Sequence, residues 1–332
     1  MRVTGLAAAM SVLTLLPCVA RECTSQDYTA ATSLLPKIPA DCDALDLSES
    51  SINTAGATTL ALALTTATRL TTLNLRYNTI GAAGATAFAE VLPRTPWLEI
   101  LNVRFNSIGA AGATALAAAL PHATHLRTLD LDGNSIGADG VTAVAEALPM
   151  AKHLATLDLS RNSIGAAGAT ALAAALPEAT QPATLFLWNN SMGDEGVSAL
   201  AAALPKARQL TKLHVGMNSV TDTGAVALAE ALSKRTRLTT LDLEANSIGD
   251  AGATALADAL PKASQLARLL LGSNSIGDAG AVALAGALLK APHLTALALD
   301  NNSIGEVGKA ALDQVVVYEA LPAIERRTNT EL

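Results

Sequence analysis

The sequence predicts an α/β solenoid of about ten stacked 28-residue repeats, and three observations lead to this fold class. The first is a row of asparagines that recur every 28 residues: Asn78, Asn106, Asn134, Asn162, Asn190, Asn218, Asn246, Asn274 and Asn302. The second is a glycine six places after each of these asparagines. The third is a proline that closes most repeats at one phase. A fixed period of this length is typical of stacked architectures, in which each unit contacts its neighbours.

Each repeat is expected to form a strand, a turn and a helix. Leu129 and Leu131 alternate with polar residues, which predicts a short strand that buries both leucines. Asn134 follows at the turn, where its amide is expected to satisfy backbone groups of its own repeat and of the neighbouring one. Gly140 is expected at the helix start, for a special dihedral angle or a close contact, and Pro149 is expected to stop the helix. Ser50 replaces the asparagine in the first repeat, which suits a capping unit.

The repeat pattern, L-x-x-L-x-L-x-x-N-x-I followed by G-x-x-G-x-x-x-L-x-x-x-L, resembles the ribonuclease-inhibitor-like class of leucine-rich repeats over about four fifths of the chain. That class includes ribonuclease inhibitor, the sensor ends of NOD-like receptors and the Ran GTPase-activating protein. The resemblance implies a right-handed horseshoe, with a parallel sheet on the concave face and helices outside. The chain departs from ribonuclease inhibitor because its repeats lack cysteine and have one length. The resemblance leaves the partner open, because one fold serves many functions.

Four segments are expected along the chain. Residues 1–20 resemble a signal peptide: Arg2 is followed by an uncharged run that ends in the small residues Cys18-Val19-Ala20. Residues 21–44 are expected to form an N-terminal cap, 45–312 the solenoid, and 313–332 a C-terminal cap with a polar tail. A membrane anchor or a first helix is the alternative for 1–20. The protein is therefore expected to be secreted or at the cell surface, with the cytoplasm as the alternative.

Two cysteines, Cys23 and Cys42, remain after removal of the predicted signal peptide. A disulfide between them would suit an oxidising compartment and would pin the N-terminal cap. The alternative is two unbonded thiols.

Charge and motif content exclude several classes of function. A net charge of -7 without a basic stripe argues against nucleic-acid binding. The sequence predicts no cofactor, no metal site and no membrane span after signal removal. Among the histidines, only His214 falls on a strand position that faces the concave side, and it has no plausible nucleophile beside it. The protein is therefore expected not to be an enzyme.

The concave face is the predicted binding surface, because residues between the strand leucines line up in rows across it. Four of the eight aromatic residues in the chain fall there, which favours a contact surface. The alternative for two of them, Phe186 and Trp188, is that they cover the irregular repeat around Pro182. The predicted partner-binding residues are Tyr77, Phe105, Phe186, Trp188, Arg76, Arg104, Asp130, Asp132, Asp158 and His214.

The charged members of this set have two expected roles. Arg76 and Arg104 lie side by side and suit a carboxylate of the partner, or form a solvated pair. The three aspartates are expected to form a solvated acidic patch that attracts a basic partner. They are a poor cage for Ca²⁺, which needs six or more oxygens.

The expected function is a non-enzymatic scaffold that binds a protein or peptide along the concave face. The alternative is a GTPase activator similar to the Ran GTPase activator, with Arg76, Asn102 and Arg104 approaching a nucleotide; no catalytic residue is carried over. A third possibility is a recent duplication with little specialised function. Asn189 and Asn301 begin glycosylation sequons, and a sugar on Asn189 would crowd Trp188.

Overall fold

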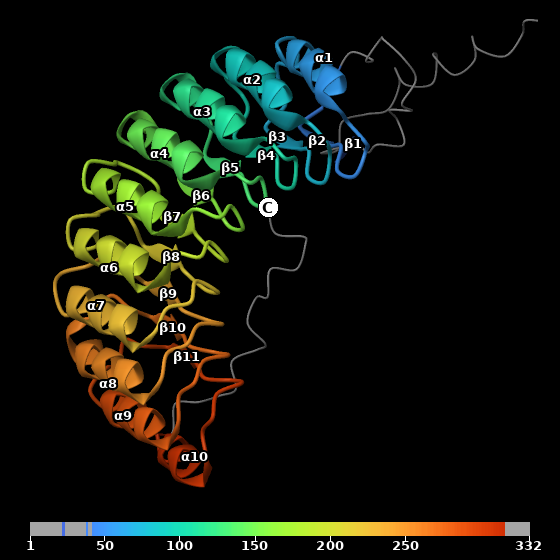
Figure 1. Ribbon diagram of the computed structural model, residues 1–332. Helices are drawn as coiled ribbons and strands as arrows, with labels where there is room; N and C mark the ends of the chain where they lie inside the picture. The colour runs from blue at the N-terminus through green and yellow to red at the C-terminus, as the bar shows by residue number, and fades with distance from the viewer. Residues whose placement is uncertain (1–21, 24–37, 39–41, 316–332) are drawn as a thin grey trace, which may run out of the picture.

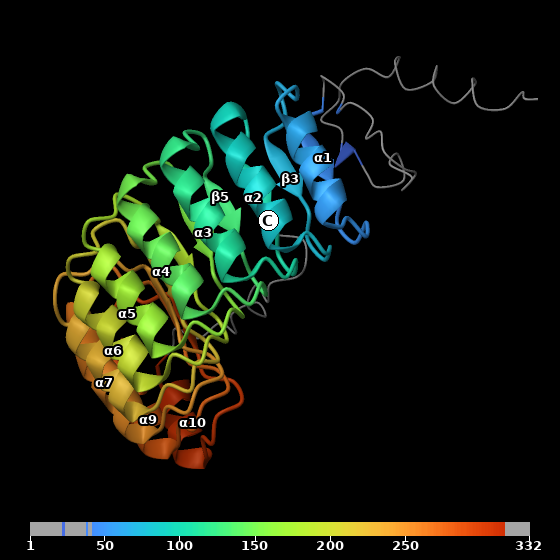
Figure 2. The same ribbon diagram turned by 45° about the horizontal axis from the view of Figure 1, so that its top comes forward.

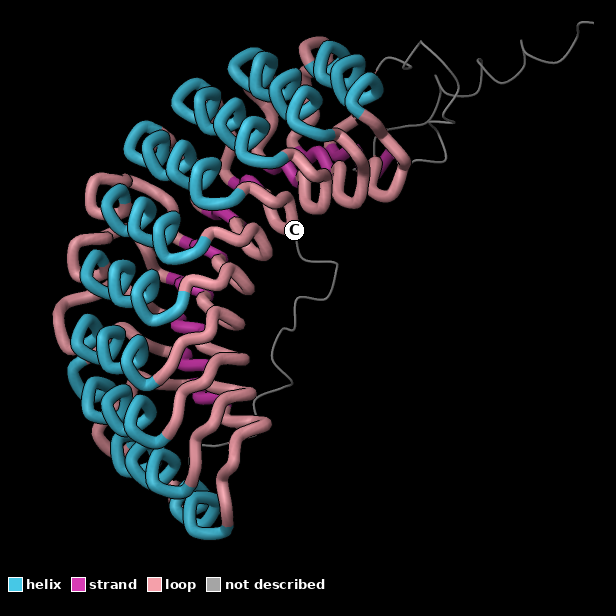
Figure 3. The backbone as a smooth tube through the Cα atoms, in the orientation of Figure 1, coloured by secondary structure: helices cyan, strands magenta, loops and turns pink. Residues whose placement is uncertain are grey.

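The computed structural model describes residues 22–23, 38 and 42–315, which form an open horseshoe (Figure 1). Short parallel strands line its inner side and helices cover its outer side (Figure 3). The predicted signal peptide and most of the predicted C-terminal tail lie outside the described residues. The α/β solenoid predicted from the repeat is confirmed.

The described strands form one parallel sheet in chain order, so that each strand pairs with its neighbours in sequence. Their register equals the repeat, as Leu101 pairs with Leu129 and Leu129 with Leu157. The strands are β1 (Glu22–Cys23), β2 (Ala44–Asp46), β3 (Thr72–Asn74), β4 (Ile100–Asn102), β5 (Thr128–Asp130), β6 (Thr156–Asp158), β7 (Thr184–Phe186), β8 (Lys212–His214), β9 (Thr240–Asp242), β10 (Arg268–Leu270) and β11 (Ala296–Ala298). A parallel connection needs a crossover, and one helix per repeat supplies it.

The helices stack side by side along the outer face (Figure 2). They are α1 (Thr54–Leu64), α2 (Gly81–Val91), α3 (Gly109–Ala119), α4 (Gly137–Ala147), α5 (Gly165–Ala175), α6 (Gly193–Ala203), α7 (Asp222–Leu232), α8 (Asp250–Ala259), α9 (Asp278–Leu288) and α10 (Glu306–Asp313). Short 3-10 turns that contain the closing proline follow four of them: η2 (Leu92–Arg94), η3 (Leu120–His122), η4 (Leu148–Met150) and η5 (Leu260–Lys262). None of the helices in the described part of the chain has the length and apolar character to span a membrane.

The asparagine row joins each repeat to its neighbours. The buried amide of Asn134 donates to the carbonyls of Val103 and Leu131, at 2.9 and 3.0 Å. Its Oδ1 accepts from the backbone N–H of Asn106 at 2.9 Å. These bonds link the turn of one repeat to the strand and turn of the preceding repeat. They give hydrogen-bond partners to buried backbone groups that would otherwise have none.

The glycine six places after each asparagine serves close packing between helices. A Cβ added to Gly112 would lie 2.9 Å from Ile108 Cβ and 3.0 Å from Ala85 Cβ in the preceding helix. Such distances are shorter than ordinary contacts between carbon atoms. The close contact, and not a special dihedral angle, therefore explains this row.

The later repeats start their helices in a different way from the earlier ones. In the earlier repeats the glycine at the helix start has positive φ, as at Gly165 (65°), and its N–H donates to the backbone of the next repeat's asparagine, Asn190. In the later repeats an aspartate accepts from the following repeat: Asp222 Oδ1 accepts from Gly249 and Gly252 at 2.7 and 2.9 Å. A carboxylate of one repeat thus caps the helix of the next.

The first aspartate of this kind is Asp194, which binds the backbone of Thr221 and Gly224. Partial desolvation raises the pKa of its carboxyl group, and the hydrogen bonds from Thr221 and Gly224 lower it. The hydrogen bonds together have the larger effect, so the pKa lies below its usual value. Thr221, at the position of the usual glycine, is extended and adds a hydroxyl bond to the same carboxylate at 2.6 Å.

Candidate functional site

Side chains reach the concave face from the strand positions between the buried leucines. Leu129 in β5 and Leu131 just after it are 0% exposed and belong to the core. Asp130 and Asp132 alternate with them and therefore face the concave side. The residue just before each asparagine extends this surface beyond the strand, and it has positive φ before all nine asparagines.

The first cluster on this surface is a pair of stacked aromatic rings. The rings of Tyr77 and Phe105 are parallel within 10°, with centroids 4.8 Å apart. Both residues have positive φ, as does Gly133 at the equivalent position of the next repeat. A Cβ on Gly133 would lie 2.4 Å from the Phe105 ring, so the glycine leaves the space that the ring occupies. Tyr77 is 40% exposed and forms the accessible end of the stack.

Two arginines flank Phe105 and share one carboxylate. The guanidinium carbons of Arg104 and Arg161 lie 5.0 and 5.1 Å from the Phe105 ring centroid. Arg104 Nε lies 3.2 Å from Asp132 Oδ2. Arg161 Nε donates to Asp132 Oδ1 at 2.9 Å, and its Nη2 contacts Oδ2. Cation–π and ionic contacts therefore hold both guanidinium groups on the protein's own surface.

These contacts change the expected role of the predicted arginine pair. Arg104 binds Asp132 instead of standing ready for a carboxylate of a partner. Arg76 lies beside Tyr77, with its guanidinium carbon 5.9 Å from the ring. Arg161 was missed by the sequence analysis. Its only signal was its position, one residue before Asn162, which is the row that also holds Tyr77 and Phe105.

The expectation of a solvated acidic patch was wrong. Asp130, Asp132 and Asp158 are 1%, 0% and 1% exposed, and their carboxylate oxygens lie within 4.8 Å of one another. One reason is that the guanidinium groups of Arg104 and Arg161 bind Asp132. Another is that backbone N–H groups hold the other two carboxylates: Asp130 Oδ1 accepts from Asp132, and Asp158 Oδ1 from Ser160, each at 2.9 Å.

The electrostatics of Asp132 follow from this burial. Desolvation and the neighbouring charge of Asp158 raise the pKa of its carboxyl group, while the hydrogen bond and charge of Arg161 and the charge of Arg104 oppose the rise. Only one oxygen from each of the three carboxylates converges on this point, fewer than the six or more oxygens that Ca²⁺ needs, and two cationic side chains already bind Asp132.

The second cluster joins three neighbouring repeats. Phe186 stacks on His214, with ring centroids 4.4 Å apart. His214 Nδ1 lies 3.1 Å from Asp242 Oδ2, and Trp188 Nε1 donates to the same oxygen at 3.1 Å. A Cβ on Gly216 would lie 2.3 Å from Trp188 Nε1, so the indole lies over this glycine. Phe186 and Trp188 therefore contact the two following repeats, at β8 and β9. The alternative interpretation from the sequence was that they cover the irregular repeat around Pro182.

The remaining predicted residues lie outside these two clusters. Asn189 and Asn301, which begin the two sequons, are exposed, and Asn189 directly follows half-buried Trp188. Cys42 is buried, and its Sγ lies 3.2 Å from the carbonyl oxygen of Ala44. Cys23 lies in β1 opposite Leu45. The Cys23–Cys42 disulfide stays a prediction.

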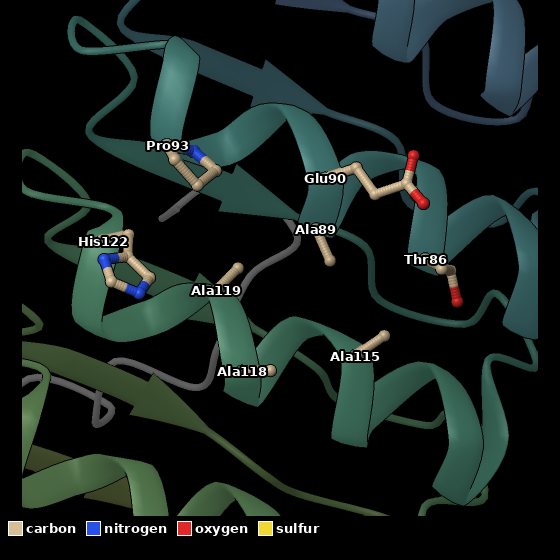
Figure 4. A pocket seen from close by; sticks show the side chains of 8 residues that line it. All are labelled: Thr86, Ala89, Glu90, Pro93, Ala115, Ala118, Ala119 and His122. Carbon is tan, nitrogen blue, oxygen red and sulfur yellow. The ribbon is translucent and has the colours of Figure 1, made fainter.

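The outer face offers shallow depressions between helices. One lies between α2 and α3 and is lined by Thr86, Ala89, Glu90, Pro93, Ala115, Ala118, Ala119 and His122 (Figure 4). Four of its eight lining residues are alanines and its lining is mostly apolar, so it presents few polar groups to a ligand. A second is lined by Leu120, Pro121, Ala123, Thr124, Met150, Lys152 and His153. The concave face, with its ordered aromatic and charged groups, is the stronger candidate for recognition.

Comparison with known proteins supports the repeat. The family model described as Leucine Rich repeat matches residues 67–89, 95–117, 122–145, 151–173, 188–201, 207–229, 236–257 and 266–285. Among solved structures, an internalin from Listeria monocytogenes is 20% identical, with a TM-score of 0.49; the match covers 83% of this chain and 79% of that chain. No curated protein matches the sequence.

Proposed function

The chain belongs to the leucine-rich repeat family, and from this premise we propose that it is a non-enzymatic scaffold that binds a protein or peptide along its concave face. The observation that carries the proposal is the pair of ordered aromatic clusters on that face, Tyr77 with Phe105 and Phe186 with Trp188. Rigid aromatic side chains lose little conformational entropy on binding and are enriched among the residues that dominate interface energy.

The two clusters are suited to anchoring because their own neighbours hold them in place. Trp188 is half-buried, and its hydrogen bond to Asp242 fixes the indole across Gly216. Phe186 is held against His214. A partner that covers these rings would therefore bury apolar area without having to order the side chains first.

The finer family assignment is also a proposal. We infer that the repeats are of the ribonuclease-inhibitor-like class, because one full α-helix follows every strand from β2 to β11 and the period is 28 residues. A GTPase activator is the less favoured function. Arg104 is engaged with Asp132, and Asn102 Oδ1 accepts from the backbone N–H of Arg104 at 3.0 Å, so both side chains already bind groups of the sheet.

The double substitution Phe186→Ala with Trp188→Ala tests the binding site. Peptides selected from a random phage-displayed library on the wild-type protein are the probes, and their affinity is measured by fluorescence anisotropy. We expect the double variant to bind the selected peptides at least about 30-fold more weakly, since loss of an aromatic anchor costs on the order of 2 kcal/mol.

The matched control is Val226→Ala with Val282→Ala, which removes two exposed apolar side chains from the outer face. This variant should bind the peptides as the wild type does. Circular dichroism establishes that both variants remain folded. Unchanged affinity in the folded Phe186→Ala, Trp188→Ala protein would contradict the proposed site.

We further propose that the protein is exported, with cleavage after Ala20 and a Cys23–Cys42 disulfide. The basic, apolar and small-residue order of residues 1–20 supports export. The pairing of Cys23 with Leu45, three residues from Cys42, supports the bond because it brings the two chain segments together. N-terminal sequencing should find Arg21 first, and mass spectrometry without reduction should find both thiols protected from alkylation. An intact Met1 would contradict export, and alkylation of Cys23 and Cys42 would contradict the bond.

A further inference from the structure

In the later repeats, the edge of the horseshoe where helices return to strands carries concentrated positive charge, although the whole chain has a net charge of -7. Four consecutive connections there, residues 204–211, 233–239, 260–267 and 289–295, contain seven lysines and arginines and no aspartate or glutamate. All seven residues are exposed. We call this set the basic edge: Lys206, Arg208, Lys234, Arg235, Arg237, Lys262 and Lys290.

Four members of the basic edge form a row with the period of the repeat. Lys206, Lys234, Lys262 and Lys290 stand 28 residues apart, just after the ends of α6, α7, α8 and α9. These helices pack side by side, and packed helices lie about 8–10 Å apart, so the row extends over roughly 24–30 Å. The sequence analysis found no basic stripe, and that expectation was wrong, because cations 28 residues apart become neighbours only when the repeats stack.

The fold itself does not require the basic edge. A cation after a helix interacts favourably with the C-terminal end of the helix dipole. The four preceding repeats nevertheless have Arg94, His122, Met150 and Glu178 at the position of the lysines. No residue of the basic edge forms an ion pair within the described part of the chain. Their charges are therefore available to an anionic ligand.

Carboxylates border the basic edge on both sides. Exposed Glu230 of α7 and exposed Asp258 of α8 lie about one helical turn before Lys234 and Lys262. On the other side, Asp242 at the end of β9 faces the concave surface. A wide anionic ligand, such as a lipid bilayer or a DNA duplex, would also approach these carboxylates, and like charges repel. A thin anionic chain can follow the cations alone.

Two arguments favour a polysaccharide among thin anionic chains. The four connections contain no Phe, Tyr or Trp on which the bases of a single-stranded nucleic acid could stack. An acidic peptide would have to order its backbone along the row, and exposed ion pairs contribute too little to offset that loss of conformational entropy. A polysaccharide carries its sulfate and carboxylate groups on rigid sugar rings, so it loses less freedom on binding.

We propose that the basic edge binds a linear anionic polysaccharide that carries sulfate or carboxylate groups. The polysaccharide lies along the row from Lys206 to Lys290, and the guanidinium groups of Arg208 and Arg237 bind its anionic groups through paired hydrogen bonds. This site is separate from the concave face. The proposal therefore goes beyond the proposed function and does not depend on it.

Removal of the lysine charges tests the proposal. The probe is a fluorescein-labelled heparin octasaccharide, and anisotropy measures its Kd at several salt concentrations. The variant with Lys206→Gln, Lys234→Gln, Lys262→Gln and Lys290→Gln should bind the probe at least about tenfold more weakly than the wild type. The slope of log Kd against log salt should also fall by about 3, because each lost cation releases roughly 0.7 fewer counterions on the scale of single-stranded polyanions.

The matched control removes the same number of positive charges from the same edge in the earlier repeats: Arg69→Gln, Arg94→Gln, Arg127→Gln and Lys152→Gln. This variant should bind the probe as the wild type does, because its substitutions lie outside the basic edge. Circular dichroism establishes that both variants remain folded. An equal loss of affinity in the two variants would overturn the proposal, since it would show a dependence on net charge alone. Absence of heparin binding to the wild type would overturn it as well.

Competition establishes the class of ligand. Unlabelled heparin should displace the probe at a lower concentration of anionic groups than duplex DNA, poly-glutamate or vesicles of phosphatidylglycerol and phosphatidylcholine. More effective displacement by any of these three would contradict the choice of a polysaccharide. Library-selected peptides should bind the four-lysine variant as they bind the wild type, because Phe186 and Trp188 lie outside the basic edge. Failure of the heparin experiment therefore leaves the proposed function standing.

Discussion

Replacing Asn134 with alanine is expected to lower the free energy of unfolding by about 3 kcal/mol or more. The substitution removes the donors to Val103 and Leu131 and the acceptor for Asn106. Asn134 is 0% exposed, so water does not replace the lost bonds. Each buried group left without a partner costs about 1–3 kcal/mol. Urea denaturation followed by circular dichroism measures the change.

The substitution should also weaken the cooperativity of unfolding between the repeats before and after Asn134. Its bonds belong to the interface between neighbouring units, and a stack with one weakened interface unfolds less cooperatively. Hydrogen exchange should therefore show the repeats before Asn134 opening independently of those after it. The matched control is Asn302→Ala, at a half-buried rung in the last described repeat, where the loss should be clearly smaller. An equal loss at Asn134 and Asn302 would contradict the role of burial.

Two glycines of helix α9 should respond in opposite directions to the same substitution. Gly280→Ala is expected to destabilise the protein by about 1–3 kcal/mol, since overpacking forces side chains or backbone to move. Its added Cβ would lie 2.8 Å from Asp250 Oδ1 and 2.9 Å from Ala253 Cβ in the neighbouring helix α8. The same shift would disturb the bond from the Gly280 N–H to Asp250, which is 2.8 Å long.

Gly286→Ala is the matched control, because it places the same methyl group on the exposed side of the same helix. A Cβ there would have no neighbour within 4 Å. We expect a gain of about 0.5–1 kcal/mol, since alanine is the better helix former and restricts the unfolded chain. Thermal unfolding of both variants measures the difference. Destabilisation at both positions would show that helix geometry, and not contact between repeats, sets the response.

The sequence predicted the fold well because the same pattern of leucine, asparagine and glycine positions recurs from repeat to repeat. Alternating leucines such as Leu129 and Leu131 specify a strand by period, and the recurring asparagine marks the turn. The strand register also follows, since residues one repeat apart, such as Leu101 and Leu129, must pair when equal units stack. Single residues within this pattern were harder to interpret.

The candidate site was only partly predictable. The sequence predicted that Tyr77, Phe105, Phe186 and Trp188 lie on one surface. It did not predict which residues their side chains contact. Trp188 reaches Asp242, 54 residues further along the chain, by crossing the space above Gly216. Such a contact depends on side-chain direction and on a missing Cβ in the next repeat, and neither quantity has a periodic signal.

The sequence by itself determined the repeat length, the order of strand, turn and helix, and the rows that face the concave side, because these depend on local periodicity. The tertiary structure decided that Asp130, Asp132 and Asp158 are buried and that Arg161 joins Arg104 at Asp132. It also decided that aspartates such as Asp222 cap the helix of the following repeat. These features depend on atoms brought together from different repeats, where burial and distance set the strength of each charge interaction.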